Sequence, residues 1–144
     1  MIIKNTHLEL SEVESLLAAI SNCYNPPLGD VVDLKVYSKK LYHYACFIVC
    51  SEESSNKIWG FMAYYKNQKT SQIYITQFCV DTRVQHQGIG GKMLDYLVRI
   101  SKEGYSTMAL EVDKLNNKAY RFYIKNGFCI SEDRGSKYLM LKKI

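Results

Sequence analysis

The sequence predicts a mixed α/β fold in which one sheet is covered by helices on both faces. A helix-like apolar period near the N-terminus is followed by three consecutive strand-like runs. After residue 80, helix-like and strand-like segments alternate, an order that is typical of a mixed sheet between layers of helices. The chain has 144 residues, of which 47% are hydrophobic and 23% charged, so we expect one globular domain over residues 1–144.

The first third of the chain predicts an edge strand and two helices. Met1 to Lys4 is a short apolar run, as in a strand. Val13, Leu16, Leu17 and Ile20 lie on one face of a helix, which we expect to be capped at Ser11. The segment Asn25-Pro26-Pro27-Leu28-Gly29 should end that helix, because proline cannot continue one. A weaker helical pattern covers residues 33–43.

Runs rich in apolar, β-branched and aromatic residues follow. They predict a three-stranded meander with strands at Tyr44–Cys50, Ile58–Tyr65 and Gln72–Val80. A new helix face is then marked by Ile89, Met93, Leu97 and Ile100, and it ends near Gly104. The remaining segments predict a strand, a helix and two strands, at Thr107–Val112, Asn117–Asn126, Phe128–Ser131 and Lys137–Leu141.

Composition disfavours several classes of protein. No apolar run approaches the roughly 20 residues of a membrane helix, and the N-terminus lacks the pattern of a secretory signal, so we expect a cytoplasmic protein without a membrane partner. The five cysteines include no Cys-x-x-Cys pair and the three histidines are scattered, which favours reduced, buried thiols and no metal. The formal charge of +5 suits a polyanionic ligand and equally fits solubility alone. No basic stripe with interleaved aromatic residues indicates nucleic-acid binding.

A glycine-rich turn joins the third strand of the meander to the helix that begins near Ile89. Glycines at 88, 90 and 91 leave room for a ligand to approach the backbone closely. The first amides of a helix lack intrahelical partners, and the helix dipole adds positive potential there. Together these features predict a site for a diphosphate. Glycines also begin and end helices without binding a ligand, so the turn alone leaves that alternative open.

The turn resembles a motif of the Gcn5-related N-acetyltransferases. Gln85-x-x-Gly88-x-Gly90 matches the family pattern Gln/Arg-x-x-Gly-x-Gly/Ala at the same junction of strand and helix. In that family, backbone amides of this turn hold the diphosphate of coenzyme A. Many members have Gly and then Lys or Arg where this chain has His86 and Gln87. We expect Arg83 and Lys92 to supply some of the missing positive charge.

A second segment resembles the family's other signature. Asn116, Ala119, Phe122, Tyr123, Gly127 and Phe128 form the pattern Asn-x-x-Ala-x-x-Phe-Tyr-x-x-x-Gly-Phe. Each residue also has a structural explanation, as an N-cap, a core residue or a helix end. The resemblance implies a mostly antiparallel sheet of six to seven strands, splayed between strands 4 and 5, with about four helices. It also implies acetyl-CoA as co-substrate, bound by Phe78, Cys79, Val80, Gln85, His86, Gln87, Gly88, Ile89, Gly90, Gly91, Asn116 and Tyr123.

The implied reaction is direct attack of a primary amine on the thioester. The resemblance assigns the general acid to Tyr123, whose phenol stays protonated at neutral pH, and a carbonyl-binding amide to the strand at Phe78–Val80. Glu111 is the first candidate for the base, because strand alternation places it on the face opposite Leu110 and Val112. Leu-Glu-Val also resembles the ribosomal-protein-alanine acetyltransferases, although many relatives use this glutamate for structural pairing. Asp30, Asp33 and His43 are the reserve candidates.

The acceptor is less well specified than the donor. The family builds the acceptor pocket from the segment that corresponds to residues 22–45. Tyrosines are frequent there and on nearby strands, at Tyr24, Tyr37, Tyr42, Tyr44, Tyr64, Tyr65 and Tyr74. Phenol rings suit a small polar amine such as an amino sugar or a polyamine. A protein N-terminus or lysine, and a non-catalytic acyl-CoA-binding module, are the alternatives, and the sequence leaves room for a homodimer.

Overall fold

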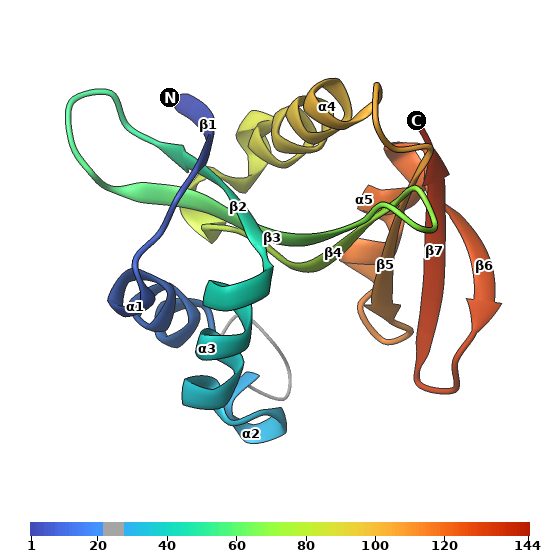
Figure 1. Cartoon of the computed structure of the whole chain (residues 1–144), viewed down its shortest axis with the longest axis horizontal. Helices are drawn as coiled ribbons and strands as arrows, with labels where there is room; N and C mark the ends of the chain where they lie inside the picture. Colours follow the sequence, from blue (N-terminus) through green and yellow to red (C-terminus); the bar gives the residue numbers. More distant parts are fainter. Residues whose placement is uncertain (22–27) are drawn as a thin grey trace.

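The protein forms one seven-stranded sheet with helices on both faces. The computed structural model describes residues 1–21 and 28–144. The strand order is β1-β2-β3-β4-β5-β7-β6, and every neighbouring pair is antiparallel except β4 and β5. The predicted mixed α/β fold is therefore confirmed (Figure 1). The strands are β1 (Ile2–Thr6), β2 (Cys46–Ser51), β3 (Ile58–Asn67), β4 (Gln72–Val80), β5 (Thr107–Asp113), β6 (Cys129–Asp133) and β7 (Lys137–Lys143).

The helices follow the predicted order, with two short additions. They are α1 (Leu10–Ile20), α2 (Leu28–Val31), α3 (Leu34–Tyr44), α4 (Ile89–Ser101) and α5 (Asn117–Lys125), with a 3₁₀ turn, η2, at Thr82–Gln87. The short helix α2 and the 3₁₀ turn were not predicted. Strand β2 begins two residues later than expected, because α3 continues to Tyr44.

The predicted cap of α1 at Ser11 is wrong. The helix begins at Leu10 with Glu9 as its N-cap. The Glu9 backbone N–H donates to Glu12 Oε1 at 3.0 Å, within a capping box that fixes this start. Within the predicted stop at 25–29, residues 25–27 lie outside the described part of the chain; α1 ends earlier, at Ile20, and Leu28 and Gly29 begin α2.

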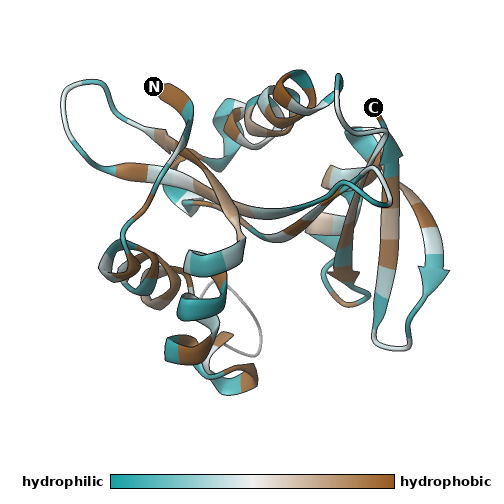
Figure 2. Cartoon of the chain, in the orientation of Figure 1, coloured by the Kyte–Doolittle hydropathy of each residue, from teal (hydrophilic) through white to brown (hydrophobic). Residues whose placement is uncertain are grey.

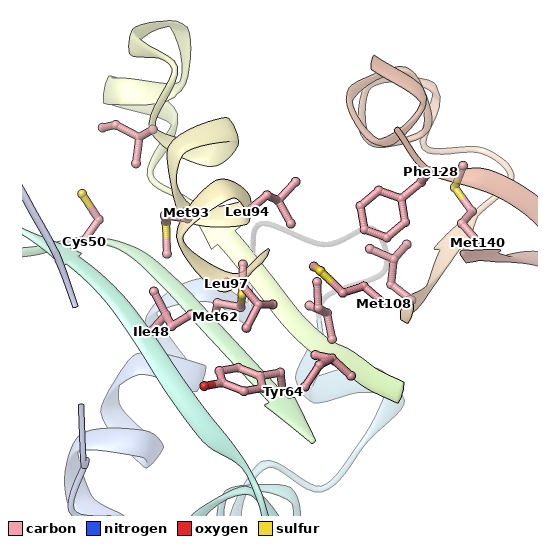
Figure 3. Close-up of a cluster of buried hydrophobic side chains, with 14 of the residues drawn as sticks. Ile48, Cys50, Met62, Tyr64, Met93, Leu94, Leu97, Met108, Phe128 and Met140 are labelled. Carbon is pink, nitrogen blue, oxygen red and sulfur yellow. The ribbon is translucent and has the colours of Figure 1, made fainter. Parts of the chain in front are cut away.

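Two apolar cores lie on opposite faces of the sheet. The larger core joins α4 and α5 to the sheet, and the smaller one joins α1 and α3 to β2 and β3. Figure 2 shows hydrophobic residues concentrated on α1 and along the strands. Figure 3 shows the larger core, in which Met93, Leu94 and Leu97 of α4 share one cluster with Ile48, Met62, Met108, Phe128 and Met140. Burial of these side chains is the main force that holds each helix against the sheet.

The sheet splits between β4 and β5. These strands pair only at Gln72↔Thr107, Ile73↔Met108 and Tyr74↔Ala109. Beyond Tyr74, β4 stays paired with β3 as far as Val80, and β5 stays paired with β7 as far as Asp113. The predicted splay between strands 4 and 5 is therefore present, and the ends of the two strands diverge (Figure 1).

A β-bulge lies in β4 at the start of this split. Ala63 of β3 pairs with Gln77, whereas the next residue, Tyr64, pairs with Ile75. Thr76 is thus an extra residue without a partner on β3, which bends the strand and re-aims its neighbouring groups.

Two further expectations concern the thiols and the membrane. Cys46, Cys50, Cys79 and Cys129 form no disulfide among the described residues, and of these four only Cys50 is buried. Cys23 lies outside the described residues. Among the helices of residues 1–21 and 28–144, none has the length and apolar character that spanning a membrane requires. The single domain over residues 1–144 and the cytoplasmic location stay predictions.

Candidate active site

The 3₁₀ turn at 82–87 places Gly88 between two helices. Asp81 caps the turn by accepting the Arg83 N–H at 2.9 Å. Gly88 then adopts φ +75°, a left-handed conformation that favours glycine, and serves as the N-cap of α4. Among the described residues, no atom lies within 4 Å of where a Cβ at Gly88 would stand. The space beside the N-cap of α4 is therefore open, which fits the diphosphate of coenzyme A.

Gly90 and Gly91 have different surroundings. A Cβ at Gly90 would stand 3.0 Å from Phe122 Cζ, so glycine lets α4 approach α5 closely. The Phe122 ring also packs on Phe78 of β4, with ring centres 6.0 Å apart. At Gly91 the nearest atom to such a Cβ is Asn126 Oδ1, at an ordinary 3.6 Å. Gly90 thus has a packing role besides its predicted binding role, whereas Gly91 and Gly88 do not show one.

Gln85 links the turn to two other elements. Its Nε2 donates to the Val80 carbonyl at 2.9 Å, and its Oε1 accepts from the ammonium of Lys118 on α5. His86 and Gln87, also predicted to bind the cofactor, are exposed beside it. Sequence reasoning missed Lys118, because the only local signal was a lysine in the first turn of a helix.

Arg83 does not supply free positive charge to the turn. Its guanidinium donates to both carboxylate oxygens of Asp81, at 2.7 and 3.0 Å, and lies 4.9 Å from the centre of the Trp59 ring. These hydrogen bonds, from the Arg83 side chain first and then from its backbone, lower the pKa of Asp81 to about 2. The expectation for Arg83 is therefore corrected, and Lys92 stays exposed on the first turn of α4.

The carbonyl-binding backbone was predicted at Phe78–Val80, but the irregular backbone of β4 lies slightly earlier. Tyr37 of α3 contacts both residues at the bulge: its hydroxyl lies 2.7 Å from Thr76 Oγ1 and accepts from Gln77 Nε2 at 3.0 Å. Phe78 faces the larger core, and the Val80 carbonyl is engaged by Gln85. We call the Tyr37, Thr76 and Gln77 contacts the Tyr37 clamp.

Tyr123 lies on α5 in a partly buried aromatic cluster. Its ring packs on Phe122 and Phe128, with ring centres 5.4 and 5.5 Å apart. Burial, and then the proximity of Cys79 on β4, raise the pKa of the Tyr123 phenol above its ordinary value. The phenol therefore stays protonated well into the alkaline range. Asn116 caps the same helix by accepting the Ala119 N–H at 3.1 Å, so its side-chain oxygen is already used within the fold.

Glu111 is exposed on β5, two residues beyond the last pair with β4. Its neighbours Leu110 and Val112 are buried, so the predicted alternation is confirmed. Glu111 Oε1 accepts from the Tyr74 hydroxyl at 3.2 Å, and Oε2 lies 3.5 Å from Arg134 Nη1. Burial first, and the Glu111 carboxylate next, raise the pKa of Tyr74 to about 12. The carboxylate stands where the split between β4 and β5 opens.

The reserve bases lie in less suitable places. Asp33 Oδ1 accepts the Lys35 and Val36 N–H groups at 3.0 and 3.2 Å, so it serves as the N-cap of α3. His43 lies between the rings of Tyr42 and Tyr44, at 5.3 and 6.2 Å. Tyr42 also packs 6.1 Å from His7, which follows β1, so these rings lie towards the opposite edge of the sheet from β5. Asp30 is exposed on α2.

The predicted acceptor tyrosines divide into groups. Tyr65 and Tyr74 are paired across β3 and β4, and Tyr37 lies near both. Burial, and then Tyr37, raise the pKa of Tyr65 to about 12. Tyr64 belongs instead to the larger core, and its hydroxyl donates to Asn5 Oδ1 at 3.3 Å. Tyr24 lies outside the described residues.

Comparisons with known proteins agree with this geometry. A sequence model described as the acetyltransferase (GNAT) family matches residues 13–128. No curated protein matches the chain. Similar solved structures include the coenzyme A complex of PaiA N-acetyltransferase from Thermoplasma acidophilum, with 19% identity, 100% of both chains covered and a TM-score of 0.75. Ard1 from Thermoplasma volcanium has 21% identity over 100% of this chain and 99% of its own, with a TM-score of 0.72. A ribosomal-protein-alanine N-acetyltransferase from Escherichia coli has 18% identity over 99% of this chain and 94% of its own, with a TM-score of 0.75.

The likeness to these structures shows the fold, whereas the family match, which covers most of the chain, shows the family. No group of three or more His, Cys, Asp or Glu side chains suited to a metal occurs in residues 1–21 and 28–144. The chain belongs to the acetyltransferase (GNAT) family and is an acyltransferase that uses acetyl-CoA.

Proposed function

We propose that the chain transfers the acetyl group of acetyl-CoA to a primary amine of a small molecule, such as an amino sugar or a polyamine. The observation that carries the proposal is the pair of groups at the split in the sheet. Glu111 offers an exposed carboxylate on β5, and Tyr123 offers a protonated phenol beside the end of β4. A base and an acid are the two protein groups that direct amine acetylation needs.

The roles of the two groups follow from proton balance. Acetyl-CoA supplies an acetyl group on a thioester, and the new C–N bond replaces its C–S bond. Glu111 accepts a proton from the attacking amine, directly or through a water. Tyr123 donates its proton to the departing sulfur. In this proposal a backbone amide at the β4 bulge or just after it donates to the carbonyl oxygen as negative charge develops there.

The residues around Glu111 support a small polar acceptor. Tyr74 donates to this carboxylate, and Tyr37 and Tyr65 lie near Tyr74. Such phenol rings offer apolar faces with polar tips. A carboxylate beside the Tyr74 hydroxyl suits a cationic amine before it loses its proton.

A protein N-terminus is the second candidate acceptor. The exposed position of Glu111 in Leu-Glu-Val favours it, because the same tripeptide carries the resemblance to ribosomal-protein-alanine acetyltransferases. A lysine side chain of a protein is the third candidate acceptor. The family match favours catalysis over a module that only binds acyl-CoA. A homodimer stays a prediction.

A free-thiol release assay with acetyl-CoA tests the proposal. The acceptors are amino sugars, polyamines, amino acids and N-terminal peptides, and Tyr123→Phe serves as the matched variant. We expect faster release with at least one small amine than with any peptide, and slower release by the variant. Faster turnover of peptides would instead support the protein acceptor. No release with any amine, by protein that binds acetyl-CoA, would support the non-catalytic module.

A further inference from the structure

Few positive charges are available at the turn that is expected to hold the diphosphate. Arg83 is paired with Asp81, and the positions after Gln85 carry His86 and Gln87, neither of which is a Lys or an Arg. One cation reaches the turn from elsewhere in the chain. Lys118 of α5 donates from its ammonium to Gln85 Oε1, 33 residues away in sequence.

Gln85 holds Lys118 without neutralising it. The Gln85 amide donates through Nε2 to the Val80 carbonyl, so its oxygen is the atom left to accept from Lys118. The partner of Lys118 is therefore a neutral amide, and the full positive charge remains. None of the ion pairs found in the described part of the chain includes Lys118. An ammonium has three N–H donors, and one is used by Gln85, so others remain for a ligand.

The position of Lys118 is unfavourable unless an anion lies nearby. Lys118 is in the first turn of α5, two residues after the N-cap Asn116. The positive end of the helix dipole lies there, and a lysine at that end is destabilising. Gly88, three residues after Gln85, is the N-cap of α4, so a second positive helix end lies close by. A phosphate at this junction would relieve the repulsion among the Lys118 ammonium and the positive ends of α4 and α5.

We propose that Lys118 binds a phosphate group of acetyl-CoA and supplies the positive charge that residues 86 and 87 do not. The inference depends on the proposed placement of the diphosphate at the turn. Either the diphosphate or the 3′-phosphate has the required chemistry. Because α5 also carries Tyr123, a bound phosphate would join the turn to the helix that holds the general acid.

Calorimetric titration with coenzyme A and with 3′-dephospho-coenzyme A tests this proposal. The variants are Lys118→Met, which keeps a long unbranched side chain, Lys118→Arg, which keeps the charge, and Lys125→Met as a control on the same helix. We expect Lys118→Met to weaken coenzyme A binding roughly tenfold, about the loss of one charged hydrogen bond. Lys118→Arg should stay within about threefold of wild type, and Lys125→Met should be unchanged.

The two ligands distinguish the phosphates. An equal loss with both ligands assigns Lys118 to the diphosphate, whereas a loss with coenzyme A alone assigns it to the 3′-phosphate. A salt titration gives a second measurement: added salt should weaken binding to wild type more steeply than binding to Lys118→Met. The melting temperature without ligand should not fall in Lys118→Met, because the variant removes a cation from a positive helix end.

Two results would overturn the proposal in distinguishable ways. Wild-type affinity and an unchanged salt dependence in folded Lys118→Met would exclude Lys118 as a ligand while leaving the proposed function intact. Failure of the wild-type protein to bind coenzyme A would reject both. If Lys118→Met did not fold, Lys118→Gln would take its place under the same criteria.

Discussion

The cofactor side of the molecule and the acceptor side are built from different kinds of contact. The cofactor side consists of the end of β4, the turn at 82–88, α4 and α5, and most of its features are local: a capped 3₁₀ turn, a left-handed Gly88 and a capped α5. The acceptor side consists of α3, Tyr65, Tyr74 and Glu111, and its contacts join distant residues. Tyr37 reaches Thr76 across 39 residues, and Tyr74 reaches Glu111 across 37.

This difference explains why the donor is easier to recognise than the acceptor. Local conformations require particular residues at particular spacings, so they leave a motif in the sequence. Contacts between distant side chains depend on the packing of whole elements, and they leave only a loose pattern, here a frequency of tyrosine. Variants on the two sides should therefore affect different measurements.

The largest effect is expected for Tyr123→Phe. Loss of the phenolic proton should lower kcat by about 10- to 1,000-fold, around the range for loss of a general acid, while acetyl-CoA affinity is kept. Because the pKa of Tyr123 is raised, the wild-type acid should stay active up to about pH 10. Single-turnover rates together with calorimetric binding measure the two quantities. An unaltered rate, with chemistry limiting, would remove Tyr123 from the mechanism.

The sequence predicted the fold well because its signals are periodic or local. The burial of Leu110 and Val112 beside the exposed Glu111 follows directly from strand alternation. The predicted cap of α1 was wrong because Ser11 and Glu9 both lie near the helix start. The reciprocal contact of Glu9 with Glu12 makes Glu9 the N-cap.

The site was predicted less completely than the fold. The bulge at Thr76 depends on the register between β3 and β4, which no run of residues displays. Arg83 was expected to supply positive charge at the turn, but the carboxylate of Asp81, two residues away, pairs with it. Lys118 reaches the turn from α5, which lies close to α4 at Gly90, where a Cβ would lie 3.0 Å from Phe122, and no local pattern displays this packing.

An intermediate effect is expected for Tyr37→Phe, on the acceptor side. Loss of the Tyr37 clamp should let the β4 bulge shift, and we expect kcat to fall about tenfold with little change in the KM for acetyl-CoA. Stability should fall by about 1 kcal/mol for each lost hydrogen bond. Steady-state kinetics and denaturant unfolding measure both effects.

Tyr65→Phe is the matched control for stability. The Tyr65 hydroxyl is buried and has no hydrogen-bond partner in the described part of the chain, so its removal should leave stability unchanged or raise it. Equal destabilisation by the two variants would show that the Tyr37 contacts do not hold the bulge.

Adjacent glycines on the cofactor side are expected to differ in their effect on stability. Gly90→Ala should destabilise the protein by roughly 1–3 kcal/mol, because its Cβ would push against Phe122. Gly91→Ala should be neutral, or stabilising by up to about 1 kcal/mol, since that position has room and alanine favours helices. Thermal unfolding of the two variants measures the difference. Equal melting temperatures would show that Phe122 gives way and that α4 and α5 are not tightly packed there.

The pH–rate profile of Glu111→Gln tests the proposed reaction most directly. If Glu111 takes the proton of the amine, kcat/KM should fall by about 10- to 100-fold at neutral pH. It should then recover partly as the pH rises towards the pKa of the free amine, near 10, where neutral amine becomes abundant. The melting temperature should change little, because glutamine keeps the size of the side chain and can still accept from Tyr74. Parallel profiles for variant and wild type, with a lowered melting temperature in the variant, would contradict the account and make Glu111 a structural partner of Tyr74 and Arg134.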